Sequence, residues 1–326
     1  MHSTDTAGTV AAAIRDADSI FIAAHENPDG DAVGSLLGLR SILLSLGKRV
    51  HAATPTPAPA RFHFLEDFDA LSTDPPAEQP DLAIALDCDG ADRLGDLKDA
   101  ILAAPKVVDI DHHGGVNAFG DIRLVDSAAA ATAILVMDVA RELGVQQPSA
   151  QQASALYTAL IADTGCFRFT NTSPAALRLG AELVAAGADP SDLSRRVFTI
   201  RPMEAVRLEA RALSSLTLID GTIAIATLAR EDFEQIGATA ELTEGIIDDF
   251  RDAIGVRAAV LLKESTPGTW QVSMRGERVD VASVARKFEG GGHKYAAGCT
   301  IKGSRDDVTT RLTSALQEAV REAPNA

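Results

Sequence analysis

The chain has 326 residues and a formal net charge of -16. This length exceeds the usual size of one domain and predicts two, and a composition of 46% hydrophobic, 23% charged and 4% aromatic residues is that of a globular protein. So much negative charge repels long polyanions, which argues against a nonspecific nucleic-acid coat. The three cysteines, Cys88, Cys166 and Cys299, form no CxxC pair, so we expect neither a disulfide framework nor a thiolate zinc site.

The N-terminal segment and the apolar stretches indicate the cellular location of the protein. The N-terminal segment carries acidic residues where a secretory signal carries basic ones, and charged residues such as Arg40 and Asp138 interrupt the apolar stretches. We therefore expect no export signal, no membrane span and a cytoplasmic protein.

The first half alternates short apolar runs with segments of helical period, which is typical of a parallel sheet covered by helices. This predicts an α/β domain over residues 1–187. Its strands are expected at residues 20–24, 49–53, 82–86, 106–110 and 122–125. Its helices are expected at residues 32–46, 129–143, 150–162 and 174–186.

The alternation ends near residue 187, and residues 188–216 are predicted to form a helical linker in which Pro202 suits a first helical turn. A second, smaller α/β domain is expected over residues 217–326. It would contain strands at 223–228, 258–263 and 269–274, helices at 242–253 and 281–288, and a glycine-rich turn.

Four segments place aspartate or histidine at or just beyond the end of a predicted element. In an open parallel sheet ligands gather outside the carboxyl ends of the strands, so these segments could meet. Each alone is weak evidence, because aspartate and glycine are common in turns and at helix ends, and a histidine pair can be merely structural. The segments are HENPDGD from His25, Asp87-Cys88-Asp89, DIDHHGG from Asp109, and Asp163-Thr164-Gly165.

Aspartates combined with histidines, without cysteine, favour manganese or magnesium over structural zinc. Left without cations, converging carboxylates repel one another, and two divalent ions would neutralise four of them. A two-metal site activates a water molecule and stabilises the charge on a transferring phosphoryl group. The four candidate carboxylates are Asp29, Asp31, Asp87 and Asp163.

Taken in order, HENPDGDAVGS, LDCDGADRLGD, DIDHHGG and IADTGCFRF resemble the four motifs of the DHH phosphoesterase family. FEGGGHKYAAGC resembles the signature of the DHH-associated C-terminal domain. Five ordered motifs across nearly the whole chain are highly specific. The chain is most similar to the nanoRNase and pAp phosphatase branch, whose members degrade short oligoribonucleotides, 3',5'-bisphosphonucleosides such as pAp, and linear dinucleotides such as pApA.

This resemblance implies a role for each candidate ligand. Asp111 would accept a hydrogen bond that orients a neighbouring histidine. His113 would face the scissile phosphate, where it could contact a nonbridging oxygen or help to protonate the leaving group. The implied metal ligands are His25 and Asp29 for one ion, Asp31, His112 and Asp163 for the other, and Asp87 bridging both.

The glycine run before His293 would bind an anion, because consecutive glycines let backbone N–H groups turn toward it. Gly291 and Gly292 would contribute these groups, and the alternative is a flexible loop. The resemblance assigns Arg275 and His293 to the far phosphate or ribose of the substrate, and Arg275 can contact a phosphate with two N–H groups. Gly276 and Glu289 depart from the family pattern and leave the substrate preference open.

We therefore expect a phosphoesterase with two divalent cations, of which Mn²⁺ is favoured over Mg²⁺ or Co²⁺, acting on short rather than long nucleic acid. The resemblance implies a homodimer. Cyclic dinucleotides are an open substrate class. One alternative is an inorganic pyrophosphatase or exopolyphosphatase. The C-terminal domain of those enzymes relies on a basic signature, whereas this chain has the GGGH segment. The other is a non-catalytic dinucleotide-binding regulator, which would not need the complete ligand set.

Overall fold

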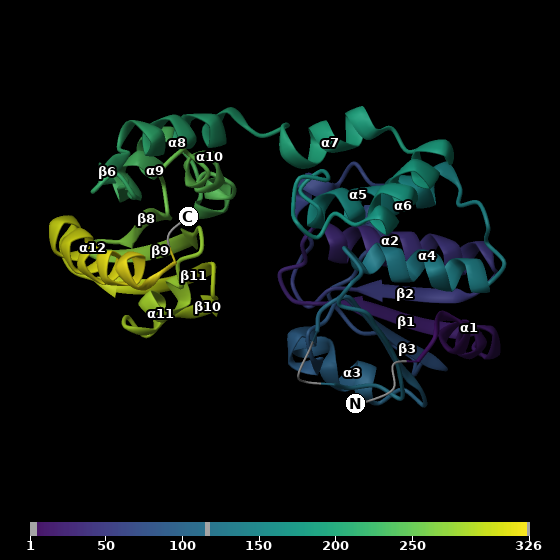
Figure 1. The fold of residues 1–326 in the computed structure, drawn as a ribbon. Helices are drawn as coiled ribbons and strands as arrows, with labels where there is room; N and C mark the ends of the chain where they lie inside the picture. The colour runs from purple at the N-terminus through teal and green to yellow at the C-terminus, as the bar shows by residue number, and fades with distance from the viewer. Residues whose placement is uncertain (1–4, 115–117, 325–326) are drawn as a thin grey trace. The chain divides into compact units, whose positions relative to one another are not determined.

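A computed structural model describes residues 5–114 and 118–324 of the chain. The chain divides into two compact units, Met1–Ile200 and Arg201–Ala326, each of which is described by itself (Figure 1). Both units combine helices with one sheet, in agreement with the α/β class expected. Within the described part of the chain, no helix combines the length and the apolar character needed to cross a bilayer.

The first unit is built on a five-stranded sheet of order β2-β1-β3-β4-β5 in which all neighbours run parallel. The three central strands are buried along nearly their whole length, as expected for a sheet covered on both faces. The strands are β1 (Ser19–Ala24), β2 (Arg49–Ala53), β3 (Leu82–Leu86), β4 (Val107–Asp111) and β5 (Ile122–Val125).

Helices cover both faces of this sheet. Helices α1, α2, α4, α5 and α6 share one large apolar core with it, and η3 and α3 enclose a smaller core on the opposite face (Figure 1). The helices are α1 (Ala7–Asp16), α2 (Gly30–Ser45), α3 (Lys98–Leu102), α4 (Thr132–Glu142), α5 (Ala150–Asp163), α6 (Pro174–Ala185) and α7 (Pro190–Phe198), with short 3-10 turns η1 (Ala60–Phe62), η2 (Phe68–Ala70) and η3 (Ala91–Leu97).

The second unit contains a six-stranded sheet of order β10-β11-β9-β8-β7-β6, in which only β7 and β8 pair in parallel. Its strands are β6 (Thr217–Ile219), β7 (Ile223–Leu228), β8 (Ala258–Thr266), β9 (Thr269–Gly276), β10 (Gly291–His293) and β11 (Ala296–Lys302). Its helices are α8 (Met203–Ser214), α9 (Arg230–Ile236), η4 (Ala240–Thr243), α10 (Asp248–Arg251), α11 (Val281–Arg286) and α12 (Arg305–Glu322).

Two core clusters lie on opposite faces of this second sheet. Helices α11 and α12 pack on one face against alternate residues of β7, β8 and β9. Helix α8 and the segment around α10 pack on the other face, where they cover β7 and β8. The alternation of buried and more exposed residues along β9 follows from this arrangement, because alternate side chains of a strand point to opposite faces.

The structure differs from the sequence expectations at several elements, among them α1 and α12, which the sequence did not predict. The helix expected at residues 242–253 is replaced by η4 and α10, because Gly245 between them has a φ of +84° that no helix accommodates. The expected glycine-rich turn forms the edge strand β10. Residues 188–216 contain α7, which packs on α5, and α8, which packs on β7.

Candidate metal centre

The site lies at the carboxyl edge of the parallel sheet in the first unit. His25 directly follows β1, Asp87 follows β3, and His112 follows β4. The strand order reverses between β1 and β3, and such a switch point leaves an opening at the carboxyl edge where ligands bind. Residues far apart in sequence therefore meet because parallel strands end at the same edge.

Helix α2 contributes two carboxylates through its first turn. Asp29 is the N-cap, and its Oδ1 accepts the backbone N–H groups of Asp31 and Ala32 at 3.0 and 3.1 Å. Asp31 is fully buried; its Oδ1 accepts the Ser35 hydroxyl at 2.8 Å and its Oδ2 accepts the Thr132 N–H at 2.6 Å. The segment that begins at His25 therefore ends in a capped helix start.

The carboxylate of Asp87 lies between His25 and His112. Its Oδ2 is 3.6 Å from His25 Nε2, and its Oδ1 is 3.4 Å from His112 Nε2. The Thr132 hydroxyl donates to Oδ1 at 3.0 Å. The backbone of Asp87 is left-handed, with a φ of +60°, which is unusual for a residue other than glycine and turns the chain sharply after Leu86.

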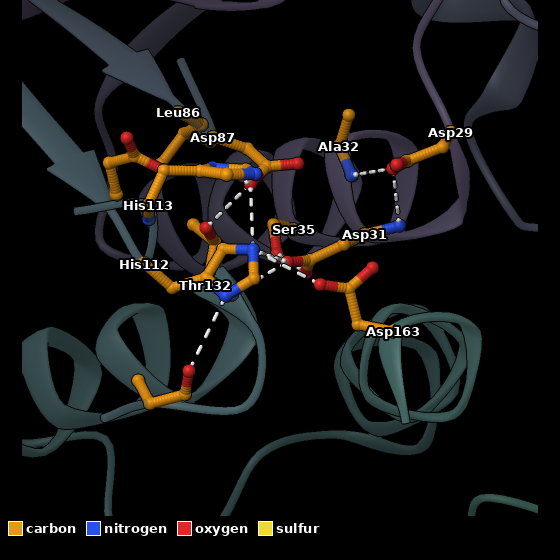
Figure 2. Close-up of polar contacts among 12 residues, drawn as sticks. Asp29, Asp31, Ala32, Ser35, Leu86, Asp87, His112, His113, Thr132 and Asp163 are labelled. Carbon is orange, nitrogen blue, oxygen red and sulfur yellow. Dashed lines mark hydrogen bonds and ion pairs between the residues drawn. The ribbon is translucent and has the colours of Figure 1, made fainter. Parts of the chain in front are cut away.

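His112 is surrounded by carboxylates. Its Nε2 is 3.0 Å from Asp163 Oδ2 and 3.8 Å from Asp31 Oδ2, while its Nδ1 lies 3.4 Å from the Ala129 carbonyl (Figure 2). Asp163 is the last residue of α5, and the Asn171 side chain donates to its carbonyl at 3.0 Å. The helix end therefore holds the carboxylate over the histidine.

His113 and Asp111 form a separate pair beside this group. Asp111 Oδ1 accepts the His113 backbone N–H at 3.0 Å and its Nδ1–H at 2.8 Å. His113 Nδ1 is also 3.5 Å from Asp87 Oδ1. The histidine that Asp111 orients is thus His113, and the ring of His112 is oriented instead by the Ala129 carbonyl.

The crowding of negative charge perturbs the titration of the group. Burial raises the pKa of Asp31 well above its ordinary value, and the carboxylates of Asp87 and Asp163 raise it further. Burial lowers the pKa of His112, but its hydrogen bond to Asp163 and the nearby carboxylates outweigh burial and raise it to about 10. For His25 the contact with Asp87 likewise outweighs burial and raises the pKa. The cluster therefore attracts positive charge strongly.

These residues fit divalent cations. Three groups bring ligand atoms within 4.8 Å of one another, and every donor is a carboxylate oxygen or an imidazole nitrogen, which suits hard or borderline ions. The thiol of Cys88 stays outside these groups and donates to the Leu86 carbonyl. The groups are His25 with Asp29 and Asp87; Asp31 with His112 and Asp163; and Asp87 with His112 and His113.

Two buried hydroxyl residues of the site were missed from the sequence. Thr132 and Ser35 are fully buried and hydrogen-bond Asp87 and Asp31, respectively. Thr132 also begins α4, so the N-terminus of that helix donates to the Asp31 carboxylate. Ser35 could have been predicted from the sequence, because residues four apart on a helix lie on the same face and Ser35 follows Asp31 by four.

Arg93 is a third missed residue. Its Nη2 lies 2.9 Å from His25 Nδ1, which is also 2.7 Å from the Glu26 carbonyl. If His25 binds a cation through Nε2, its Nδ1 must carry a proton and donate to Glu26, so the Arg93 N–H is released for another acceptor. An exposed guanidinium thus lies at the edge of the acidic cluster.

In the second unit, Arg275 and His293 lie in one cross-strand row. Ala296 of β11 pairs with Arg275 of β9 on one side and with His293 of β10 on the other. Side chains of one row share a face of the sheet, so the two predicted contacts project from the same side. Gly292 has a φ of +130°, and a Cβ there would meet the Ala296 carbonyl at 2.7 Å, whereas Gly291 borders open space.

The parallel sheet with this acidic and histidine cluster defines the class of the first unit. Residues 19–161 match the DHH family, N-terminal domain, and residues 220–322 match the DHHA1 domain. The chain belongs to the DHH family, as the sequence motifs indicated.

Relatives match both units. The chain is 34% identical over 309 residues to the bifunctional oligoribonuclease and PAP phosphatase NrnA of Thermus thermophilus, covering 93% of this chain and 91% of that protein. It is 27% identical over 292 residues to the protein of the same name from Bacillus subtilis, covering 87% and 90%. The crystal structure of an exopolyphosphatase-related protein from Bacteroides fragilis has a TM-score of 0.89 at 25% identity and covers 96% and 95%.

Proposed function

We propose that this protein is a metal-dependent phosphoesterase that hydrolyses short oligoribonucleotides and removes the 3'-phosphate of bisphosphonucleosides such as pAp. One observation carries the proposal: carboxylates and imidazoles from four segments meet at the carboxyl edge of one sheet, where excess negative charge needs cations. The names of the Thermus and Bacillus relatives, which match both units over most of their length, support the same two activities. Linear pApA and cyclic dinucleotides extend the proposed substrate range.

The residues support two divalent cations, and we assign Mn²⁺ because mixed oxygen and imidazole donors suit it better than Mg²⁺, with Co²⁺ as a substitute. When bound, such ions stabilise charge on the phosphoryl group and lower the pKa of a water nucleophile. In this proposal His25 and Asp29 would hold one ion, Asp31, His112 and Asp163 would hold the other, and Asp87 would serve both.

The remaining residues position these ligands and handle the substrate. Thr132 holds Asp87 and Asp31 in place through its hydroxyl and its N–H group. Asp111 fixes the proton of His113 on Nδ1, which leaves Nε2 to contact the scissile phosphate or to protonate the departing oxygen. Catalysis therefore depends on Asp87 and on His113.

In the second unit, Arg275 and His293 are proposed to hold the far phosphate or ribose, with the backbone of Gly291 and Gly292 beside them. Residues 1–187 would form the catalytic domain, residues 188–216 the helical connection, and residues 217–326 the substrate-binding domain. A net charge of -16 repels long nucleic acid, and a second domain that binds one end of the substrate limits its length. Both features favour short nucleotides. We further propose a cytoplasmic homodimer.

Incubation of the purified protein with Mn²⁺ or with a chelator tests the proposal. The panel would contain a pentaribonucleotide, pApA, pAp, a cyclic dinucleotide and pyrophosphate, with products separated by chromatography. In Mn²⁺ we expect mononucleotides from the pentaribonucleotide, pApA, pAp and the cyclic dinucleotide, and in chelator we expect no products. Tight binding of a dinucleotide without product would instead identify a regulator.

The alternative activity is hydrolysis of pyrophosphate or polyphosphate. Its support is the name of the Bacteroides structure, an exopolyphosphatase-related protein. Pyrophosphate and polyphosphate are compact polyanions, and the cross-strand row offers only Arg275 and His293 to neutralise them. We therefore expect pyrophosphate turnover to be much slower than pAp turnover. The reverse ratio would replace the proposed activity by that of a pyrophosphatase or exopolyphosphatase.

A further inference from the structure

The second unit contains a cavity at a distance from the cross-strand row of Arg275 and His293. Its volume is about 420 Å³, and it lies between α9 and the adjoining ends of β8 and β9. Small-molecule sites in proteins have volumes of roughly 300 to 1,000 Å³. Its lining includes Arg230, Phe233, Ala238, Lys263, Glu264 and Gln271.

One cation of the cavity lacks a carboxylate. Arg230 is paired with acidic residues of its own helix α9, and Glu264 accepts two backbone N–H groups. Lys263 is half-buried, and among the described residues its Nζ contacts only the Thr243 hydroxyl, at 3.2 Å. In a chain of net charge -16, a half-buried ammonium without a counter-ion is available to a ligand of single negative charge.

The environment of this lysine supports the same interpretation. Burial lowers the pKa of Lys263, and no carboxylate offsets that effect. A bound anion would restore the ordinary value and would gain a charge-assisted hydrogen bond from the ammonium. The ring of Phe233 and the methyl group of Ala238 supply an apolar surface in the same cavity.

The sheet register relates this cavity to the proposed substrate contacts. Trp270, Val272 and Met274 of β9 point into the core below α11 and α12, so Gln271 and Arg275 project from the opposite face. Lys263 pairs with Gln271 in the β8–β9 register. Four residues along an antiparallel strand span about 14 Å, so Lys263 and Arg275 lie on one face at a separation longer than a single phosphate group can bridge.

We propose that this cavity is a second nucleotide subsite, in which Lys263 binds one phosphate and Phe233 packs against the attached nucleoside. The inference rests on the proposed function, because the first nucleotide unit would be held by Arg275 and His293. The occupant is either the distal unit of an oligoribonucleotide substrate or a free mononucleotide. Both present the same phosphate chemistry, and the experiment separates them.

The test compares Lys263→Gln with the matched control Lys287→Gln, which changes the C-cap residue of α11, the helix that packs on the opposite face. KM and kcat would be measured in Mn²⁺ for a pentaribonucleotide and for pAp. Binding of AMP would be measured by calorimetry in chelator. We expect Lys263→Gln to raise the KM for the pentamer about tenfold and to leave the KM for pAp within about twofold of the wild-type value. The control should change neither KM.

A second variant tests the same subsite without removing the half-buried Lys263, whose loss could impair folding. Gln271→Glu is nearly isosteric and lies on an exposed position opposite Lys263, where the new carboxylate would pair with the lysine and repel a phosphate. It should show the same selective loss. Circular dichroism would establish that both variants fold.

The outcomes are distinct. A raised KM for the pentamer alone supports the oligonucleotide occupant, and loss of AMP binding with unchanged turnover supports the free mononucleotide. Equal loss on pAp and pentamer, or no effect of either variant in folded protein, overturns the subsite. If wild-type protein hydrolyses neither substrate, the proposed function fails, and the AMP measurement still decides whether the cavity binds nucleotide.

Discussion

The two units present their functional side chains in opposite ways. In the first unit three of the six candidate metal ligands, His25, Asp31 and Asp87, are buried. The six ligands come from four distant segments, and hydroxyl and backbone N–H groups hold the carboxylates of Asp31 and Asp87. In the second unit, Arg275 and His293 project from β9 and β10, the two strands that flank β11, and the edge strand β10 is exposed throughout. Charge concentrated in a buried cluster suits bond cleavage, whereas an accessible sheet face suits selection among substrates. Mutations in the two regions should therefore separate turnover from binding.

The largest effect is expected in the buried cluster. Asp87→Asn keeps the shape of the side chain but removes the charge between His25 and His112, so turnover of pAp should fall at least about 1,000-fold. The fold should persist, since asparagine keeps an acceptor oxygen for the Thr132 hydroxyl. Steady-state kinetics and circular dichroism check both statements. Turnover within tenfold of wild type would contradict the assignment of Asp87 as the bridging ligand.

A smaller effect, on substrate binding, is expected from Arg275 on the sheet of the second unit. Arg275→Ala should lower kcat/KM about 10- to 100-fold, chiefly through KM, because a charge-assisted phosphate contact contributes about 1.5 to 3 kcal/mol. Arg275→Lys should recover only part of this loss, since lysine cannot contact phosphate with two groups. A fall in kcat at unchanged KM would place Arg275 in the chemical step instead.

The glycine run provides a matched pair of variants for stability. Gly292→Ala should destabilise the second unit by about 2 kcal/mol, because its left-handed backbone and the Ala296 carbonyl leave no room for a methyl group. Gly291→Ala should change the free energy of unfolding by less than about 0.5 kcal/mol. Trp270, the single tryptophan, lies in the core of this unit, so its fluorescence during urea unfolding measures both variants.

Stability of the first unit should depend on pH through Asp109. Burial, assisted by the nearby Asp111, raises the pKa of Asp109 to about 8, above its value in the unfolded chain. Its contribution is therefore complete below pH ~4 and is lost as pH rises through about 8. Between pH 6 and pH 9 the wild-type unit should lose about 2 kcal/mol more than Asp109→Asn. Hydrogen exchange of the β4 amides at the two pH values would measure the difference, and equal losses in both proteins would refute it.

The sequence predicted the elements that obey simple periodicity. The strands at residues 49–53, 82–86, 122–125 and 223–228 have the predicted bounds. The clearest of them, 82–86, is a fully buried parallel strand, and such strands are uninterrupted apolar runs. The helix expected at 242–253 is wrong because apolar spacing outweighed Gly245, and the long helix α12 was not predicted because its surface is mostly charged. The α/β class was predicted correctly from the alternation of apolar runs with helical segments, and the family from the motifs.

Within the site, sequence could identify the charged candidates because charge at a strand end has no structural purpose. It could not identify Thr132 or Arg93, since threonine and arginine are common and their role depends on tertiary contacts alone. The pairing of Asp111 with His113 likewise depends on side-chain direction after β4, which no linear pattern encodes.

The left-handed backbone of Asp87 has an evolutionary consequence. A non-glycine residue in this conformation costs of the order of 1 kcal/mol or more, so the protein retains a residue that its own turn disfavours. Glycine or asparagine would relax this turn while abolishing the acid. Homologues that no longer hydrolyse a substrate are therefore expected to drift toward those two residues here, which makes this single alignment column a marker of lost catalysis.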